Sequence, residues 1–270
     1  MRLAGILFGL IAATILASVF IGSRSGKAGA VSVLGSTSVQ PFAEMLAQEF
    51  QKQRPDINVE VQGGGSTAGI EAIRSGITDI GTCSRELKPD ETFRKVEIAR
   101  DALAIVVHWS NPMTDLTRDR IRRIFNGQIS DWREVGGADG PIRIITREEG
   151  SGTREAFMKL VMGGDRIARK ALTQESNGAV KELVKHDPYA IGYMSLGLVH
   201  GEAKILAVDG VLPNRDTVLA KKYKLTRPFY FVLNERRAPG TDEFVKFVLS
   251  PAGQALLEGQ GLVGVKEGDR

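Results

Sequence analysis

Three short loops rich in glycine, serine and threonine each join an apolar, strand-like run to a helix-like segment. Their sequences are GSTS, GGGSTAG and TREEGSGT, at residues 35–38, 63–69 and 146–153. The first N–H groups of a helix have no partner within it, and the helix dipole adds partial positive charge there. Such an end binds anions, and glycine lets the backbone approach them closely. One serine or threonine at this position is usually only a helix cap, but three junctions with surplus hydroxyls predict a shared anion site.

Arg147, in the third loop, adds positive charge and a planar fork of donors suited to a tetrahedral oxyanion. Its alternative role is an ion pair with Glu148 or Glu149. Arg85, which follows Ser84 in the run CSRE, is a second candidate cation, although an exposed surface position is the simpler expectation for it. Ser84 itself ends a strand-like run and offers one more hydroxyl. The sequence therefore indicates an anion held by many neutral donors and few charges.

Common enzyme and metal-site motifs are missing from the sequence. Ser66 and Ser151 lack the glycine spacing of the nucleophile elbow G-x-S-x-G, and no phosphate-loop or dinucleotide motif fits the glycine-rich loops. The three histidines, at 108, 186 and 200, are far apart, and Cys83 is the single cysteine, so neither a zinc spacing nor an internal disulfide can form. Lysines and arginines are scattered despite the net charge of +4, which disfavours nucleic acid as a partner. We therefore expect no enzyme, no metal and no cofactor.

Strand-like and helix-like segments alternate from residue 31 onward, which predicts α/β architecture with mostly parallel, doubly wound sheets and ligand loops at the carboxyl ends of strands. The length of 270 residues allows one large domain or two lobes. The apolar runs 101–108 and 227–233 are the natural strands to cross between two lobes. The predicted limits are residues 31–106 plus 228–270 for the first lobe and 107–227 for a second lobe inserted into it.

The N-terminus carries an uncharged, mostly apolar stretch from Leu3 to Gly22, followed by small and basic residues that end in Ala28-Gly29-Ala30. This order is typical of a secretory signal peptide cut after Ala30. The apolar stretch is also long enough for a retained membrane anchor. Both interpretations of residues 1–30 place the rest of the chain outside the cytoplasmic membrane.

Taken together, the motifs VLGSTSVQP, VEVQGGGSTAG, TDIGTCSRELK, IFNGQISDWREVGG, ITREEGSGTREAF and AIGYMSLG resemble those of the phosphate-binding proteins of bacterial ABC transporters. The resemblance covers nearly all of residues 31–265. It implies the two-lobed periplasmic-binding-protein fold of type II, with two hinge strands and lobes that close over one phosphate. It also implies an extracytoplasmic monomer that hands phosphate to a membrane permease.

Carried over motif by motif, the resemblance implies that phosphate is held by Thr37, Ser38, Ser66, Ser84, Arg147, Ser151, Gly152 and Thr153. The best-known members place an aspartate where this chain has Ser84, and a carboxylate there accepts the proton of hydrogen phosphate while repelling sulfate. Glu148 or Glu149 is a candidate substitute acceptor. Another tetrahedral oxyanion (sulfate, molybdate or tungstate) is therefore the alternative ligand. The alternative functions are a membrane-anchored phosphate-sensing subunit and a hydrolase of phosphate esters.

Overall fold

The first part of the chain folds into three parallel strands. A helix follows each of the first two strands, and a loop follows the third. In this computed structural model, which describes residues 30–265, these elements are β1 (Val31–Gly35), α2 (Gln40–Gln53), β2 (Val59–Gly63), α3 (Ser66–Arg74) and β3 (Ile80–Cys83). Strand β1 is central, since Val33 lies opposite Val61 of β2 and Ile80 of β3. The predicted strand–helix alternation is confirmed here.

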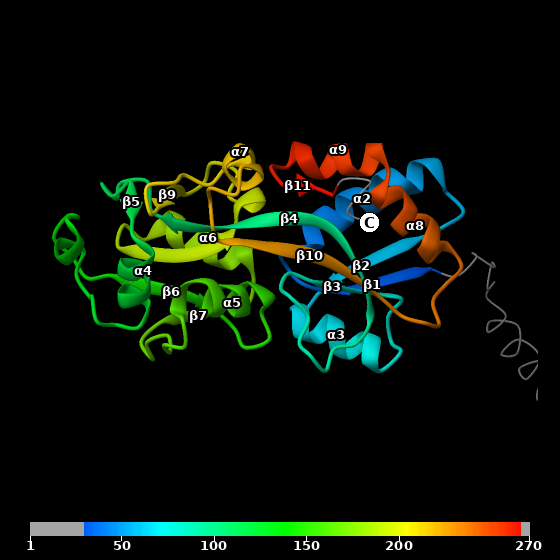
Figure 1. Ribbon diagram of the computed structural model, residues 1–270, viewed down its shortest axis with the longest axis horizontal. Coiled ribbons are helices and arrows are strands. Elements are labelled where there is room, and N and C mark those ends of the chain that lie inside the picture. Colours follow the sequence, from blue (N-terminus) through cyan, green and yellow to red (C-terminus); the bar gives the residue numbers. More distant parts are fainter. Residues whose placement is uncertain (1–29, 266–270) are drawn as a thin grey trace, which may run out of the picture.

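Helix α2 forms because its apolar residues recur at helical spacing. Phe42, Leu46 and Phe50 are buried on one face, and Phe50 packs against Phe244 and Phe247 of α8 (Gly240–Leu249), with ring centroids 5.4 and 5.6 Å apart. Helix α8 is followed by α9 (Pro251–Gly259) and the short strand β11 (Val263–Gly264). The C-terminal segment therefore packs on the first half of the molecule rather than beside its neighbours in sequence (Figure 1).

Two long strands, β4 (Arg94–Val107) and β10 (Thr226–Leu233), run antiparallel to each other and join the two halves of the molecule (Figure 1). At one end β10 pairs with β3, and at the other end β4 pairs with β8 (Ala190–Ser195) and β9 (Lys204–Val208). Strand β4 begins seven residues earlier than the apolar run at 101–108, because residues 94–100 pair with β10 although they carry four charged side chains that interrupt the apolar pattern.

The second half is another α/β unit built around parallel strands. Strand β6 pairs in parallel with β7 and β8, and Phe157 stacks on Tyr193 with ring centroids 4.0 Å apart in its core. Its remaining elements, in chain order, are β5 (Asp115–Leu116), α4 (Arg118–Phe125), a 3-10 turn (Trp132–Val135), β6 (Arg143–Arg147), α5 (Gly152–Phe157), a π-helical turn (Met158–Met162), β7 (Leu172–Gln174), α6 (Asn177–His186), a 3-10 turn (Leu196–Leu198) and α7 (Arg215–Leu219).

The strand order β2-β1-β3-β10-β4-β8-β6-β7 runs through both halves, so the predicted two-lobed α/β fold with two hinge strands is confirmed. The lobe limits at residues 106/107 and 227/228 stay a prediction. The predicted signal peptide or anchor, residues 1–30, lies outside the described residues except for Ala30. No helix within residues 30–265 is long and apolar enough to cross a membrane.

Candidate anion-binding site

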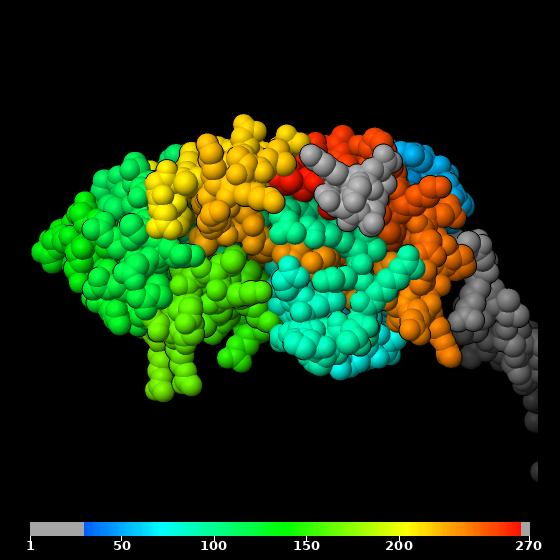
Figure 2. All heavy atoms as spheres, in the orientation of Figure 1, coloured from blue at the N-terminus to red at the C-terminus, as the bar shows by residue number. Residues whose placement is uncertain are grey.

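The three glycine- and hydroxyl-rich loops meet where the two lobes touch. Ser38 Oγ, after β1, lies 2.8 Å from Thr153 Oγ1 on α5, and the backbone N–H of Thr67 on α3 donates to the carbonyl of Gly150 at 3.1 Å. Figure 2 shows the lobes in direct contact along this border, where the half containing α3 meets the half containing α5. Residues more than a hundred positions apart in the sequence are thereby brought into one cluster.

Gly152 lies directly against the first lobe. A Cβ placed on this glycine would overlap Ser66 Oγ and Ser84 Oγ, so no larger residue fits while the lobes are closed. Ser151, just before it, caps α5 by accepting from the backbone N–H of Arg154 at 3.3 Å. The Ser151 hydroxyl proton is therefore free to point elsewhere.

The first-lobe hydroxyls form a buried chain of hydrogen bonds. Ser36 Oγ donates to Ser84 Oγ at 2.8 Å, and the backbone N–H of Ser84 donates to Ser66 Oγ at 3.1 Å. Ser66 Oγ and Ser84 Oγ lie 3.3 Å apart. Ser36 was not among the predicted site residues; its position in the GSTS run was the available signal.

Arg147 is buried at the end of β6, with a side chain only 1% exposed. Its Nε and Nη2 each lie 2.9 Å from an oxygen of Glu148, and Nη2 also donates to Thr37 Oγ1 at 3.1 Å. The remaining nitrogen, Nη1, is buried with no hydrogen-bond partner. Arg147 therefore forms the ion pair with Glu148 and also keeps one buried donor without a partner, and buried polar atoms are rarely left unpaired.

A second buried cation, Arg227, escaped the sequence analysis. Its Nη1 donates to Thr153 Oγ1 at 2.8 Å and its Nη2 to Ser38 Oγ at 3.1 Å. Its Nε donates to Asp101 Oδ2 at 2.9 Å, and the two residues are cross-strand partners on β10 and β4. Burial raises the pKa of Asp101, and the adjacent guanidinium opposes that rise. The available signal was a pair of opposite charges at the starts of the two predicted crossing strands.

Two further polar residues support the cluster. Asn177, the first residue of α6, donates from Nδ2 to Ser38 Oγ at 2.9 Å and accepts at Oδ1 from the backbone N–H of Ser195 at 3.1 Å. Ser195 Oγ donates to Asp101 Oδ1 at 2.9 Å. Asn177 lies in none of the quoted motifs, and Ser195 lies in AIGYMSLG, for which no ligand role was predicted.

The expectation of an exposed Arg85 is wrong. Its side chain is 4% exposed and forms two hydrogen bonds, of 2.7 and 2.8 Å, with Glu91. Its Nε lies 3.0 Å from Glu155 on α5, which Lys88 also approaches at 3.4 Å. Arg85 is therefore a contact between the lobes rather than a surface residue. Beside it lies a cavity of about 360 Å³ whose lining includes Lys88, Lys159 and Arg227.

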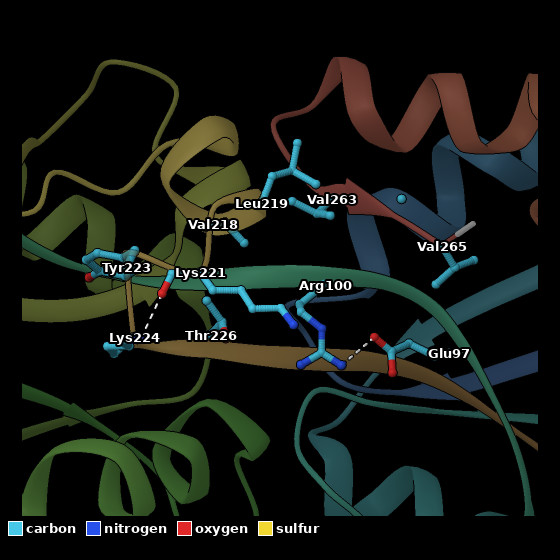
Figure 3. A pocket seen from close by; sticks show the side chains of 11 residues that line it. Glu97, Arg100, Val218, Leu219, Lys221, Tyr223, Lys224, Thr226, Val263 and Val265 are labelled. Atoms are coloured by element: carbon cyan, nitrogen blue, oxygen red, sulfur yellow. Dashed lines mark hydrogen bonds and ion pairs between the residues drawn. The ribbon is translucent and has the colours of Figure 1, made fainter. Parts of the chain in front are cut away.

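The larger cavity of about 770 Å³ lies elsewhere, where α7 and β11 face the crossing strands (Figure 3). It includes Arg100, which pairs with Glu97 at 2.8 Å, and shares none of the predicted anion-site residues. Among residues 30–265, no group of three or more His, Cys, Asp or Glu side chains is arranged to hold a metal. Cys83 is buried, and burial raises the pKa of its thiol, as befits a core residue.

A two-lobed α/β fold with crossing strands, and with hydrogen-bond donors gathered between the lobes, defines the class of the periplasmic-binding-protein-like receptors. A family model described as a PBP superfamily domain matches residues 22–252. The chain is 30% identical over 210 residues to the phosphate-binding protein PstS of Bacillus subtilis, covering 73% of this chain and 67% of that protein. It is 28% identical over 251 residues to the PstS of Borreliella burgdorferi, covering 87% and 90%.

Solved structures agree with these relatives. A structure from Clostridium perfringens, described as a phosphate ABC transporter substrate-binding protein with bound phosphate, has a TM-score of 0.86 and 38% identity, covering 88% of this chain and 100% of that one. An ABC-type phosphate transport receptor from Vibrio cholerae has a TM-score of 0.73 and 37% identity, covering 87% and 100%. The chain therefore belongs to the PBP superfamily and, within it, to the family of phosphate-binding proteins of phosphate ABC transporters.

Proposed function

We propose that this protein is an extracytoplasmic receptor that binds inorganic phosphate between its two lobes and delivers it to the permease of an ABC importer. The observation that carries the proposal is Arg147 Nη1, a buried guanidinium nitrogen with no hydrogen-bond partner, on a side chain whose Nη2 donates across the border to Thr37 Oγ1 of the first lobe. An oxyanion oxygen supplies the acceptor that this nitrogen lacks. The relative from Clostridium perfringens is described with phosphate bound.

The proposed phosphate ligands are the residues that the family resemblance implies. Arg147 supplies the charged donor, the backbone N–H groups of Gly152 and Thr153 supply neutral donors, and the hydroxyls complete the cage. The full set is Thr37, Ser38, Ser66, Ser84, Arg147, Ser151, Gly152 and Thr153.

The buried positive charges in this region have carboxylate partners within the protein. The guanidinium of Arg147 is paired with Glu148, and that of Arg227 is paired with Asp101. The charges of these two guanidinium groups are therefore already balanced within the protein, and neutral hydroxyl and backbone donors supply much of the contact with the anion.

Lobe closure is the proposed route by which the ligand is enclosed. Arg147 reaches Thr37 across the border, and Ser38 reaches Thr153, so a ligand cannot enter or leave without separation of these pairs. The crossing strands β4 and β10 supply the hinge. We assign no catalytic role to any residue of the cluster, because its serines accept or donate among themselves and no histidine contacts them.

Export and delivery complete the proposal. The segment 1–30 has the composition of a secretory signal or an anchor, and an importer receptor works on the outer side of the membrane. The proposed partners are inorganic phosphate and a membrane permease, and the proposed receptor is a monomer.

Isothermal titration of the phosphate-free protein with phosphate, sulfate, molybdate and tungstate tests the ligand. Saturable heat with phosphate at one ligand per chain is expected. No heat with phosphate together with clear binding of sulfate would overturn the assignment. A chromogenic phosphate ester serves as the control for hydrolase activity, and we expect no turnover.

A further inference from the structure

The directions of the hydrogen bonds at Ser38 are fixed by its neighbours. Arg227 Nη2 and Asn177 Nδ2 both donate to Ser38 Oγ, at 3.1 and 2.9 Å. The orientation of the Asn177 amide is set because its other end accepts from a backbone N–H. A hydroxyl has two acceptor positions and one proton. Both acceptor positions of Ser38 are therefore occupied, and its proton must point to Thr153 or to a ligand.

Thr153 is constrained in the same way. Its Oγ1 accepts from Arg227 Nη1 at 2.8 Å and lies 2.8 Å from Ser38 Oγ. If Ser38 gives its proton to Thr153, both acceptor positions of Thr153 are filled and its own proton is left for the ligand. If Ser38 gave its proton to the ligand instead, Thr153 would keep one open acceptor position. The 2.8 Å contact between the two hydroxyls corresponds to the first case, in which Thr153 offers the ligand a proton and no lone pair.

Arg227 is held in place independently of the two loops. Its Nε contacts Asp101, which in turn accepts from Ser195 Oγ, and both members of the ion pair lie on crossing strands and are at most 1% exposed. The hydroxyls from the two lobes therefore meet on a guanidinium that belongs to the hinge.

We propose that Arg227 is a positioning residue of the anion site: together with Asn177 it fills both acceptor positions of Ser38, and together with the Ser38 proton it fills those of Thr153, so that the Thr153 hydroxyl meets the ligand only as a donor. This inference rests on the proposed phosphate site and specifies the ligand form it selects. Hydrogen phosphate, with three unprotonated oxygens, fits a donor-only edge better than dihydrogen phosphate, which has two. Without Arg227 the two hydroxyls can accept, and the more protonated form regains a hydrogen bond.

The test compares wild type with the paired variant Arg227→Met/Asp101→Asn, which removes both buried charges and leaves the net charge unchanged. Phosphate affinity of the exported protein is measured by calorimetry at two pH values, one where hydrogen phosphate dominates and one where dihydrogen phosphate dominates. Relative to wild type, we expect a loss of about tenfold or more at the higher pH and about threefold or less at the lower pH. Equal losses at both pH values, or no loss, would overturn the proposal, since a purely structural defect weakens both forms alike.

Asp101 on β4 is replaced together with Arg227, and the asparagine in the paired variant does not titrate. The other ionisable groups near Arg227 are common to both proteins, so the comparison cancels their titration. They are Cys83 and Arg147, and, around the neighbouring cavity, Arg85, Glu86, Lys88, Arg100, Glu155 and Lys159. Sulfate, where it binds, should show the same fold loss at both pH values because it has no proton to give.

Two single variants complete the design. Arg227→Lys keeps a charge opposite Asp101, so it is the substitute if the paired variant does not fold. A single ammonium nitrogen cannot occupy the positions of Nη1 and Nη2 at once, so the same pH-dependent loss is expected. Tyr223→Phe is the matched control: it removes a buried hydrogen bond of 2.8 Å to the carbonyl of Leu103 on β4 and should leave phosphate affinity unchanged at both pH values. If wild type binds no phosphate, the proposed function fails; if it binds and the losses are equal, only this inference fails.

Discussion

Replacement of Arg147 by alanine removes the charged donor that faces the loop cluster while leaving the loops themselves intact. Loss of a charged partner from a buried anion costs at least ~2 kcal/mol, which corresponds to a rise in the dissociation constant of about 30-fold. The Glu148 carboxylate left behind is 25% exposed, so water can solvate it. It would, however, face the anion without its guanidinium, and that repulsion adds to the loss.

The same substitution has a separate cost in stability. The Arg147 guanidinium donates to the backbone carbonyls of Gln174 and Glu175, each at 3.1 Å, and loss of a hydrogen bond of this kind lowers the free energy of unfolding by about 0.5–1.5 kcal/mol. Urea unfolding of the phosphate-free protein measures the change in the free energy of unfolding, and calorimetry on the folded variant measures the dissociation constant for phosphate. The two measurements together prevent a folding defect from being mistaken for a binding defect.

Arg143→Met is the matched control for this experiment. Arg143 lies on the same strand, but its side chain is 54% exposed and pairs with Asp187 at 2.9 Å. Exposed ion pairs contribute about 0–1 kcal/mol, and this one is remote from the loops, so phosphate affinity should stay at the wild-type value. An Arg147→Ala protein that binds phosphate within about twofold of wild type would remove Arg147 from the site and refute the reasoning.

Three other substitutions give distinct outcomes. Gly152→Ala should abolish tight phosphate binding without unfolding the protein, because the added Cβ blocks closure of the lobes. Calorimetry measures the loss of binding, and small-angle scattering with phosphate measures whether the lobes close. Glu155→Gln should weaken phosphate affinity by only about two- to fivefold, since its contact with Arg85 is partly exposed. Burial opposes ionisation of Glu91, but hydrogen bonds from Arg85 and a backbone N–H hold its pKa below the usual value. Its contribution to stability is therefore present above the ordinary glutamate pKa and lost as pH falls through the lowered one, so Glu91→Gln should lower the urea midpoint at neutral pH and matter less in acid.

The predicted site residues come together in space because each is encoded by a local pattern. A loop such as TREEGSGT contains its cap, its glycines and its arginine within eight residues, and the strand before it and the helix after it fix where it points. Parallel neighbours then bring such loops to one edge of a sheet. This reasoning needs no knowledge of long-range contacts, which is why the sequence alone could predict that the loops carrying Arg147 and Gly152 meet the first-lobe loops.

The sequence did not predict the positions of Arg227 and Arg85, because these positions depend on long-range contacts. The Arg227–Asp101 pair joins residues 126 positions apart, and its place in the site depends on the register of two antiparallel strands. Arg85 looks like a surface residue until Glu91 and Glu155 are brought to it by separate parts of the chain. A charged side chain is buried where oppositely charged or polar partners surround it. These partners are distant in the sequence, so the local sequence does not reveal them.

A crystal structure of the protein grown with phosphate tests the central claim most directly. The account predicts one phosphate between the lobes, with Arg147 Nη1 and the backbone N–H of Gly152 and Thr153 within hydrogen-bonding distance of its oxygens, and with Ser38 and Thr153 still held by Arg227. Phosphate bound outside this cluster, or a cluster that stays empty at saturating phosphate with Arg147 Nη1 turned to another protein group, would contradict it.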